Sequence, residues 1–421
     1  MVTSVISAGD AANLGVQTTG GNDGVLVLRS GAAGAKVDAL SIAASGTATF
    51  VGEVAGVSAI NSGQIGGRRN IFYNGEMKVA QRGASATGLG ASSGIFVFDR
   101  WQTYTGGVAT AGRYTLAQVA DGPPGFANSL KISTTTADTS IAAGERFNIY
   151  QRLEGQDVQQ MQKGTATAKQ VTVSFYVKGN ATALYVCELF DLDNNRSITQ
   201  SFAVTTSWNR IELTFAADTT GALDDDNAGS FDIEIWLHGG STYTGGTFAV
   251  NTWNNYTNAN RYAVSGRTSI FDSTSRTFFL TGVQMEIGAT ATDFEHRTFG
   301  TELALCQRYY EKSYDYDVAV GATTYVGIHA AGGSAASTSG TSFISGNNVV
   351  FTVRKRDNPT IVGYDQAGNV GKSQRWELGS HNTNNQNLEI QSAATRGFYF
   401  YSSGTSSSTG VQLHFTADAE I

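Results

Sequence analysis

Cysteine and charged side chains are both scarce in this sequence of 421 residues. The 2 cysteines, Cys187 and Cys306, show no CxxC or cysteine/histidine ligand spacing, which argues against a disulfide scaffold or a zinc site. Charged residues make up 15% of the chain, below the roughly 25% of an average soluble domain. The formal net charge is −7 and no segment clusters cations, so nucleic acid is excluded as the main partner.

Long apolar runs are missing as well. No stretch approaches the roughly 18 consecutive apolar residues of a membrane-spanning helix. The first residues, from Met1 to Ser4, lack the charged and apolar regions of a secretory signal. We expect a soluble protein that carries no conventional export signal.

The chain is rich in glycine and has enough large apolar residues for a core. It contains 50 glycines, together with 41% hydrophobic and 10% aromatic residues. That composition supports a real core and excludes wholesale disorder, and the length suggests roughly two to three domains. Helical surfaces favour Lys and Glu, whereas this chain offers Thr, Ser, Gly and Asn, so we expect an all-β, multi-domain protein.

Residues 1–69 contain a single aromatic residue, Phe50. They therefore differ in composition from the segment that starts at residue 70. Short apolar runs, at 25–28 and 47–51, predict short strands with too little bulk to close an independent core. Either these strands need identical copies of themselves in a homo-oligomer, or the region is a loosely structured tether.

Between 70 and 300 the pattern becomes that of strands with one apolar face. Residues 171–178, 211–215 and 231–238 alternate apolar and polar side chains, and Gly, Asn and Asp separate them. Such strands are usually antiparallel and pair two sheets around their buried faces. The segment therefore predicts a β-sandwich, of jelly-roll type.

Residues 301–312 form the best helical pattern in the chain, with apolar residues three and four positions apart and no glycine. We expect Cys306 on its buried side, as a structural thiol. Residues 313–421 return to strand patterns around 348–353, 360–362, 398–401 and 411–415. They predict a second, smaller β domain at the C-terminus.

Several segments resemble a module of tailed-bacteriophage and prophage tail fibre proteins. They are NIFYNGEMKVAQRG (70–83), FDRW (98–101), YQRLE (150–154), SFYVK (174–178), FLTGVQMEIG (279–288), FEHR (294–297), ELALCQRYY (302–310) and FTADAEI (415–421). The resemblance covers 70–310 well and the last hundred residues less securely. Its motifs mark a family and not an activity.

The resemblance implies a structural virion protein, made in the host cytoplasm, that forms an elongated homotrimer. Its N-terminal region would attach to other tail or baseplate proteins, and its β-sandwich parts would contact host polysaccharide or an outer-membrane protein. Three subunits with weak sites would bind by avidity. The alternatives are a structural adaptor or head-decoration protein that binds other virion proteins, and a polysaccharide-cleaving tailspike.

Candidate binding residues lie on one predicted strand and in the loop after it. Glu234 and Trp236 fall on the face expected to contact water, where an aromatic ring and a carboxylate suit a sugar. Tyr176, Lys178 and Glu212 would share that face if their strands adjoin it. The alternative is that a loop or another subunit covers Trp236.

The loop from about 239 to 262 holds Tyr243, Trp253 and Tyr256 among Asn, Gly and Thr. Long loops with aromatic residues often carry function, so this one is a candidate contact with host glycan. Equally, its aromatic residues would pack down as a lid over the sandwich.

Metal binding and catalysis have weaker support. Asp224, Asp225 and Asp226, with the turn 191–195, offer the hard oxygen ligands that calcium prefers, without EF-hand order. Aspartates are also ordinary turn residues, so a solvated loop explains them too. No catalytic motif, nucleotide loop or fixed-period repeat is present. We expect a non-enzymatic protein that needs no cofactor, with calcium as the one candidate ion.

Overall fold

The computed structural model describes residues 68–107, 110–332, 335–338, 341–377, 380–404 and 410–421, together with six short strands before residue 65. The chain divides into two compact units, Met1–Ile60 and Asn61–Ile421. Within the described residues, no helix is long and apolar enough to cross a membrane. The finer division at 69, 300 and 312 stays a prediction.

The first unit contains an antiparallel sheet of four strands. Its strands are β1 (Val16–Gln17), β2 (Leu26–Ser30), β3 (Val37–Ile42) and β4 (Ala48–Phe50). Two further short strands are β5 (Ala59–Ile60), at the end of this unit, and β6 (Gly63–Gln64), which belongs to the second unit. The predicted short strands at 25–28 and 47–51 are therefore confirmed. The self-association that we expect of this region remains a prediction.

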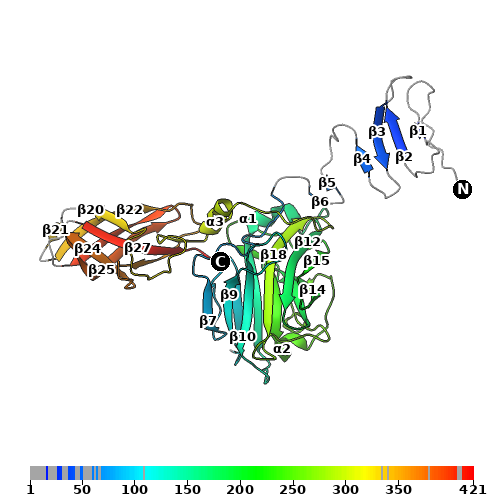
Figure 1. The fold of residues 1–421 in the computed structure, drawn as a ribbon, viewed down its shortest axis with the longest axis horizontal. Helices are drawn as coiled ribbons and strands as arrows, with labels where there is room; N and C mark the ends of the chain where they lie inside the picture. The colour runs from blue at the N-terminus through cyan, green and yellow to red at the C-terminus, as the bar shows by residue number, and fades with distance from the viewer. Residues whose placement is uncertain are drawn as a thin grey trace. The chain divides into compact units, whose positions relative to one another are not determined.

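Two antiparallel sheets of six strands form a sandwich (Figure 1). Sheet I contains, in order, β15 (Asn209–Phe215), β12 (Val171–Gly179), β18 (Thr277–Ile287), β10 (Ser129–Thr136), β9 (Arg113–Val119) and β7 (Ser85–Leu89). Sheet II contains β17 (Asn254–Asn255), β14 (Arg196–Val204), β13 (Ala183–Asp191), β16 (Gly229–Gly239), β11 (Glu145–Glu154) and β8 (Gln102–Gly107). The chain crosses repeatedly from one sheet to the other, as in jelly-roll folds.

The apolar faces of the predicted strands meet in the sandwich core. Val173 and Phe175 of β12 are fully buried, as are Ile233 and Ile235 of β16. These are the apolar positions of the alternating pattern, so the prediction of a β-sandwich is confirmed. Short helical turns between the sandwich strands are α1 (Gly155–Val158), η1 (Gln159–Met161), α2 (Ser241–Thr244) and η2 (Asn258–Asn260).

The last hundred residues form a separate curled sheet of nine strands, sheet III, with its own core. Its strands are β19 (Tyr310–Lys312), β20 (His329–Gly332), β21 (Ala335–Thr338), β22 (Thr341–Val350), β23 (Thr360–Tyr364), β24 (Lys372–Glu377), β25 (Ser380–Ala394), β26 (Gly397–Gly404) and β27 (Gly410–Asp418). The predicted C-terminal β region is confirmed.

The helix at the start of this region is shorter than predicted. α3 spans Phe299–Gln307, whereas residues 310–312 form strand β19. β19 pairs with β27, and the Ala419 amide donates to the Tyr309 carbonyl at 2.7 Å. This long-range pairing overrides local helix propensity over the last turn. Cys306 is fully buried, as predicted.

Several of the segments that resemble phage fibre proteins contact one another through hydrogen bonds and ion pairs. Asn74, in the left-handed conformation with φ of 52°, donates to the carbonyls of Val79 and Asp99 at 2.8 and 3.0 Å. Trp101 donates to the Asn74 carbonyl at 3.1 Å. Arg308 binds Glu154 through two nitrogens, at 2.8 and 2.6 Å. These contacts stabilise the fold, so the motifs have a structural role. A binding surface is expected in another part of the chain.

Candidate functional site

The segment between β16 and β18 folds back over the outer face of sheet II. Its two ends are tied together, because the Gly246 amide donates to the Ala259 carbonyl at 2.8 Å and the Tyr262 amide donates to the Tyr243 carbonyl at 2.9 Å. The Asn251 amide reaches the Thr199 carbonyl of β14 at 2.9 Å. The loop from about 239 to 262 is therefore a fixed cover with backbone contacts to the sheet.

Trp236 lies under this cover. Its side chain is 0% exposed, Tyr262 stacks on it at a ring distance of 6.0 Å, and Tyr243 packs at 5.4 Å. Its indole nitrogen donates to Glu188 at 2.8 Å. The expectation that Trp236 faces water is wrong: a loop covers it, which was the alternative interpretation.

Glu234 is also buried, in an ionic network centred on Arg261. Arg261 donates to both oxygens of Glu188, at 3.0 and 2.8 Å, and to Glu234 at 2.6 Å. Asn148 donates to the other Glu234 oxygen. Burial raises the pKa of Glu188, and Arg261 opposes that rise by favouring the charged form. The face predicted to be wet is thus a buried set of paired charges.

Arg261 gathers most of the residues that the sequence singled out. Its guanidinium carbon lies 4.7 Å from the Trp236 ring centre and 4.9 Å from that of Tyr256. Tyr243 touches Trp236 but is itself 7% exposed, so it offers little surface to a ligand. Glu234, Trp236, Tyr243 and Tyr256 therefore do come together, as the internal support of a cover and not as an open platform.

Trp253 lies apart from this group. Its indole nitrogen donates to the Ala216 carbonyl at 2.7 Å, and Lys163 lies 5.1 Å from its ring centre. Tyr176 and Glu212 belong to β12 and β15 of sheet I, so they do not share a face with Trp236. Sequence spacing placed these residues on polar faces, but it carried no information about which sheet each strand joins.

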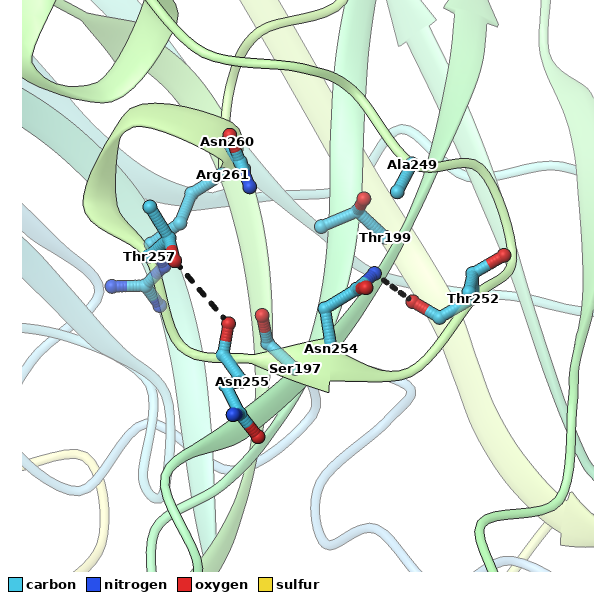
Figure 2. Close-up of a pocket in the computed structure, with 9 residues that line it drawn as sticks. All are labelled: Ser197, Thr199, Ala249, Thr252, Asn254, Asn255, Thr257, Asn260 and Arg261. Carbon is cyan, nitrogen blue, oxygen red and sulfur yellow. Dashed lines mark hydrogen bonds between the residues drawn. The ribbon is translucent and has the colours of Figure 1, made fainter.

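A narrow polar recess opens between the cover and β14 (Figure 2). It is lined by Ser197, Thr199, Ala249, Thr252, Asn254, Asn255, Thr257, Asn260 and Arg261. Apart from Arg261, every lining side chain is uncharged. Hydroxyls and amides that converge without net charge suit a neutral polyhydroxylated ligand better than an ion.

The rim of the recess is held by its own hydrogen bonds. The Asn260 side-chain oxygen accepts from the Thr247 amide at 2.9 Å, and the Asn254 amide nitrogen donates to the Thr252 carbonyl at 2.8 Å. Figure 2 shows the second of these bonds beside the Thr199 side chain. The rim is thus preorganised, which lowers the entropic cost of binding. Its signal in the sequence was the Asn- and Thr-rich composition of the loop.

The predicted calcium ligands do not form a metal site. Asp224, Asp225 and Asp226 are exposed, and an Asp226 oxygen accepts from the Ala228 amide at 2.9 Å as in an ordinary turn. Within the described ranges, no group of three or more carboxylate, imidazole or thiol side chains is placed to hold a metal ion. The solvated-turn interpretation fits these residues.

His238, at the end of β16, gives this region a dependence on pH. Its Nδ1 lies 2.8 Å from the Ser269 hydroxyl and its Nε2 3.3 Å from Glu145. Burial lowers the pKa of His238 to about 4, from an ordinary value near 6.5. Between these values the unfolded chain binds a proton that the native state does not, so this contribution to stability is lost as the pH falls through that window.

We expect His238→Gln to flatten the acid side of the stability profile. The difference in the free energy of unfolding between the parent and the variant should change by roughly 3 kcal/mol from pH 7 to pH 4, because the glutamine does not titrate. The measurement is urea unfolding at several pH values. If the free energy of unfolding of both proteins depended on pH in the same way, the assigned burial of this imidazole would be contradicted.

Comparisons with known proteins add structural likenesses at low identity. No family model matches the sequence, and no curated protein matches it. The enzymatically active domain of tailspike protein 4 from bacteriophage CBA120 is 14% identical over 45% of this chain and 19% of that chain, with a TM-score of 0.25. The chain therefore spans about a fifth of that tailspike structure.

Carbohydrate-binding modules are also among the similar structures. A family 11 module from Clostridium thermocellum, solved with a mixed-linked tetrasaccharide, is 16% identical over 50% of this chain and 99% of its own, with a TM-score of 0.26. TmCBM61, solved with a galactotriose, is 9% identical over 52% of this chain and 99% of its own, with a TM-score of 0.27.

Proposed function

We propose that this chain is a non-catalytic fibre protein of a tailed-bacteriophage virion that binds polysaccharide on the host surface. The observation that carries the proposal is the uncharged hydroxyl-and-amide recess between β14 and the loop cover. The resemblance of the sequence to tail fibre proteins supports the virion assignment. Trimerisation and attachment through the N-terminal region complete the proposal.

The recess is too small to enclose a sugar, with a volume of about 10 Å³, but its rim suits the edge of one for two physical reasons. Serine, threonine and asparagine side chains both donate and accept hydrogen bonds, as sugar hydroxyls do. Arg261, which lines the recess, is bound to Glu188 and Glu234, so the recess presents no free cation to a ligand. Each contact is weak, and three subunits per fibre would raise the overall affinity by avidity.

The test removes two hydroxyls of the recess while preserving shape. We expect Ser197→Ala/Thr199→Val to weaken binding to a panel of bacterial capsular and O-antigen polysaccharides by about tenfold, since two hydrogen bonds are lost. Ser201→Ala, on the same strand outside the recess, is the matched control. Equal binding by the double variant and the control would remove the recess as the site.

The same preparation separates the alternative functions. A structural adaptor would bind virion proteins and none of the polysaccharides. A tailspike enzyme would release reducing ends from a polysaccharide that it binds. Adsorption to host cells, with competition against infection by the purified protein, supports the fibre proposal.

A further inference from the structure

The outer face of β25 and β26, far in sequence from the recess, carries two adjacent tyrosines. Along β26, Phe398 and Phe400 are buried in the core of sheet III, at 2% and 1% exposure. The alternating residues Tyr399 and Tyr401 point to the opposite face and are half-buried. Their ring centres lie 6.2 Å apart with an interplanar angle of 37°.

Polar side chains on β25 flank both rings. Tyr399 pairs with Gln391 and Tyr401 with Glu389 in the antiparallel register. Directly paired residues project from the same face of a sheet and lie within reach of each other. Gln391 and Glu389 are exposed, as is Asn387 one position further along that face. Hydrogen-bonding groups thus line one side of a strip made by two aromatic rings.

The charges of this face select the class of ligand. Glu389 supplies a carboxylate, and Lys372 of β24, which pairs with Asn387, supplies an ammonium group at the margin. Among the described side chains of this face, one carboxylate is balanced by one ammonium group, so these side chains carry no excess charge to attract a phosphate, an acidic membrane or a nucleic acid. Rigid amphipathic rings beside amide and carboxylate groups match a neutral saccharide, whose ring has apolar faces and hydroxyl edges.

We propose that the outer face of β25 and β26, named by Tyr399, Tyr401, Glu389 and Gln391, is a second saccharide-binding site. Sugar rings stack on the tyrosines, and their hydroxyls hydrogen-bond to Glu389 and Gln391. An open sheet face accepts the interior of a long polymer, whereas the recess of the sandwich, with a volume of about 10 Å³, offers its rim groups to the edge of a sugar. The two sites act independently, and together they add to the avidity of one chain.

The experiment uses the full chain and the polysaccharide panel described above. We expect Tyr399→Ala/Tyr401→Ala to weaken binding of at least one polysaccharide by tenfold or more, since both stacking surfaces are lost. Tyr399→Phe/Tyr401→Phe keeps the rings and should stay within about threefold of the parent. Tyr325→Ala, a tyrosine outside the patch with 44% exposure, is the control for loss of an exposed ring.

The outcomes separate this inference from the proposed function. If the Ser197→Ala/Thr199→Val variant weakens binding and the alanine pair at 399 and 401 does not, the second site is wrong and the recess stands. The opposite result supports the second site and overturns the recess. An equal loss of polysaccharide affinity in the phenylalanine and alanine double variants would overturn stacking. If light scattering gave a smaller oligomeric mass for the alanine double variant than for the parent, the two tyrosines would form a subunit contact and not a binding site.

Discussion

Replacing Lys163 with methionine is expected to lower the free energy of unfolding by about 3–5 kcal/mol, because it leaves buried carboxylate charge without its cation. The Lys163 side chain is 1% exposed and ion-pairs with Asp191 and, at 3.1 Å, with Asp218. It also donates to the carbonyls of Thr220 and Gly221, at 2.9 and 3.0 Å. Its ammonium group therefore lies among four oxygen ligands from two parts of the chain, Asp191 and residues 218–221.

A compensating variant shows whether the loss comes from charge or from packing. Asp218 keeps Arg196 as a partner at 2.7 Å, whereas Asp191 depends on Lys163 for charge. Lys163→Met/Asp191→Asn should therefore recover a large part of the stability that the single change removes. Chemical denaturation of both variants measures this, and equal losses would assign the effect to packing.

The same oxygen ligands lead to an expectation about calcium. Two carboxylates and two carbonyls are hard oxygen ligands, and in the natural chain the Lys163 ammonium occupies their centre. We expect millimolar calcium to raise the melting temperature of Lys163→Met and to leave that of the parent unchanged. An equal rise in both proteins would place calcium elsewhere.

Replacing Arg261 with methionine is the second change with a large expected effect, again about 3–5 kcal/mol. It leaves Glu188, at 0% exposure, and Glu234, at 5%, buried without a cation. Because burial favours the protonated form of the Glu188 carboxyl, the loss should be smaller at pH 5 than at pH 8. Saccharide binding should also weaken, since Arg261 anchors the segment that frames the recess.

The matched control for Arg261 removes the charges together. The triple variant Arg261→Met/Glu188→Gln/Glu234→Gln replaces an uncompensated ionic network with neutral groups, so it should regain much of the stability and lose the dependence on pH. Urea unfolding at pH 5 and pH 8 gives both quantities. If the single variant loses the same stability at both pH values, the electrostatic explanation is wrong.

Much of the strand content could be predicted from the sequence. Residues 171–178 and 231–238 were expected to be strands from their alternation, and β12 and β16 span Val171–Gly179 and Gly229–Gly239. The alternating apolar residues correctly identified the core. Their polar partners were misjudged, because Ser174 is 2% and Asp232 1% exposed. The alternation of apolar and polar side chains along a strand indicates that its two faces differ. It does not indicate whether a later segment of the chain covers the polar face.

The candidate site was predictable in part. Composition singles out the long loop after β16, and its Asn and Thr side chains line the recess; its binding role stays a prediction. Arg261, the anchor of the cover, was missed, because its partners Glu188 and Glu234 lie 73 and 27 residues away in sequence. Lys163 was missed for the same reason, since no local pattern marks a cation whose carboxylates come from other elements.

Taken alone, the amino-acid sequence determined the class of fold, because side-chain alternation acts over neighbouring residues and is written in local order. The tertiary structure decided which polar residues are buried, which aromatic rings reach solvent and which cation neutralises which carboxylate. Those outcomes depend on segments that are distant in the chain meeting in space. For that reason Trp236, a natural candidate by sequence, is an internal support, while Tyr399 and Tyr401 reach the surface.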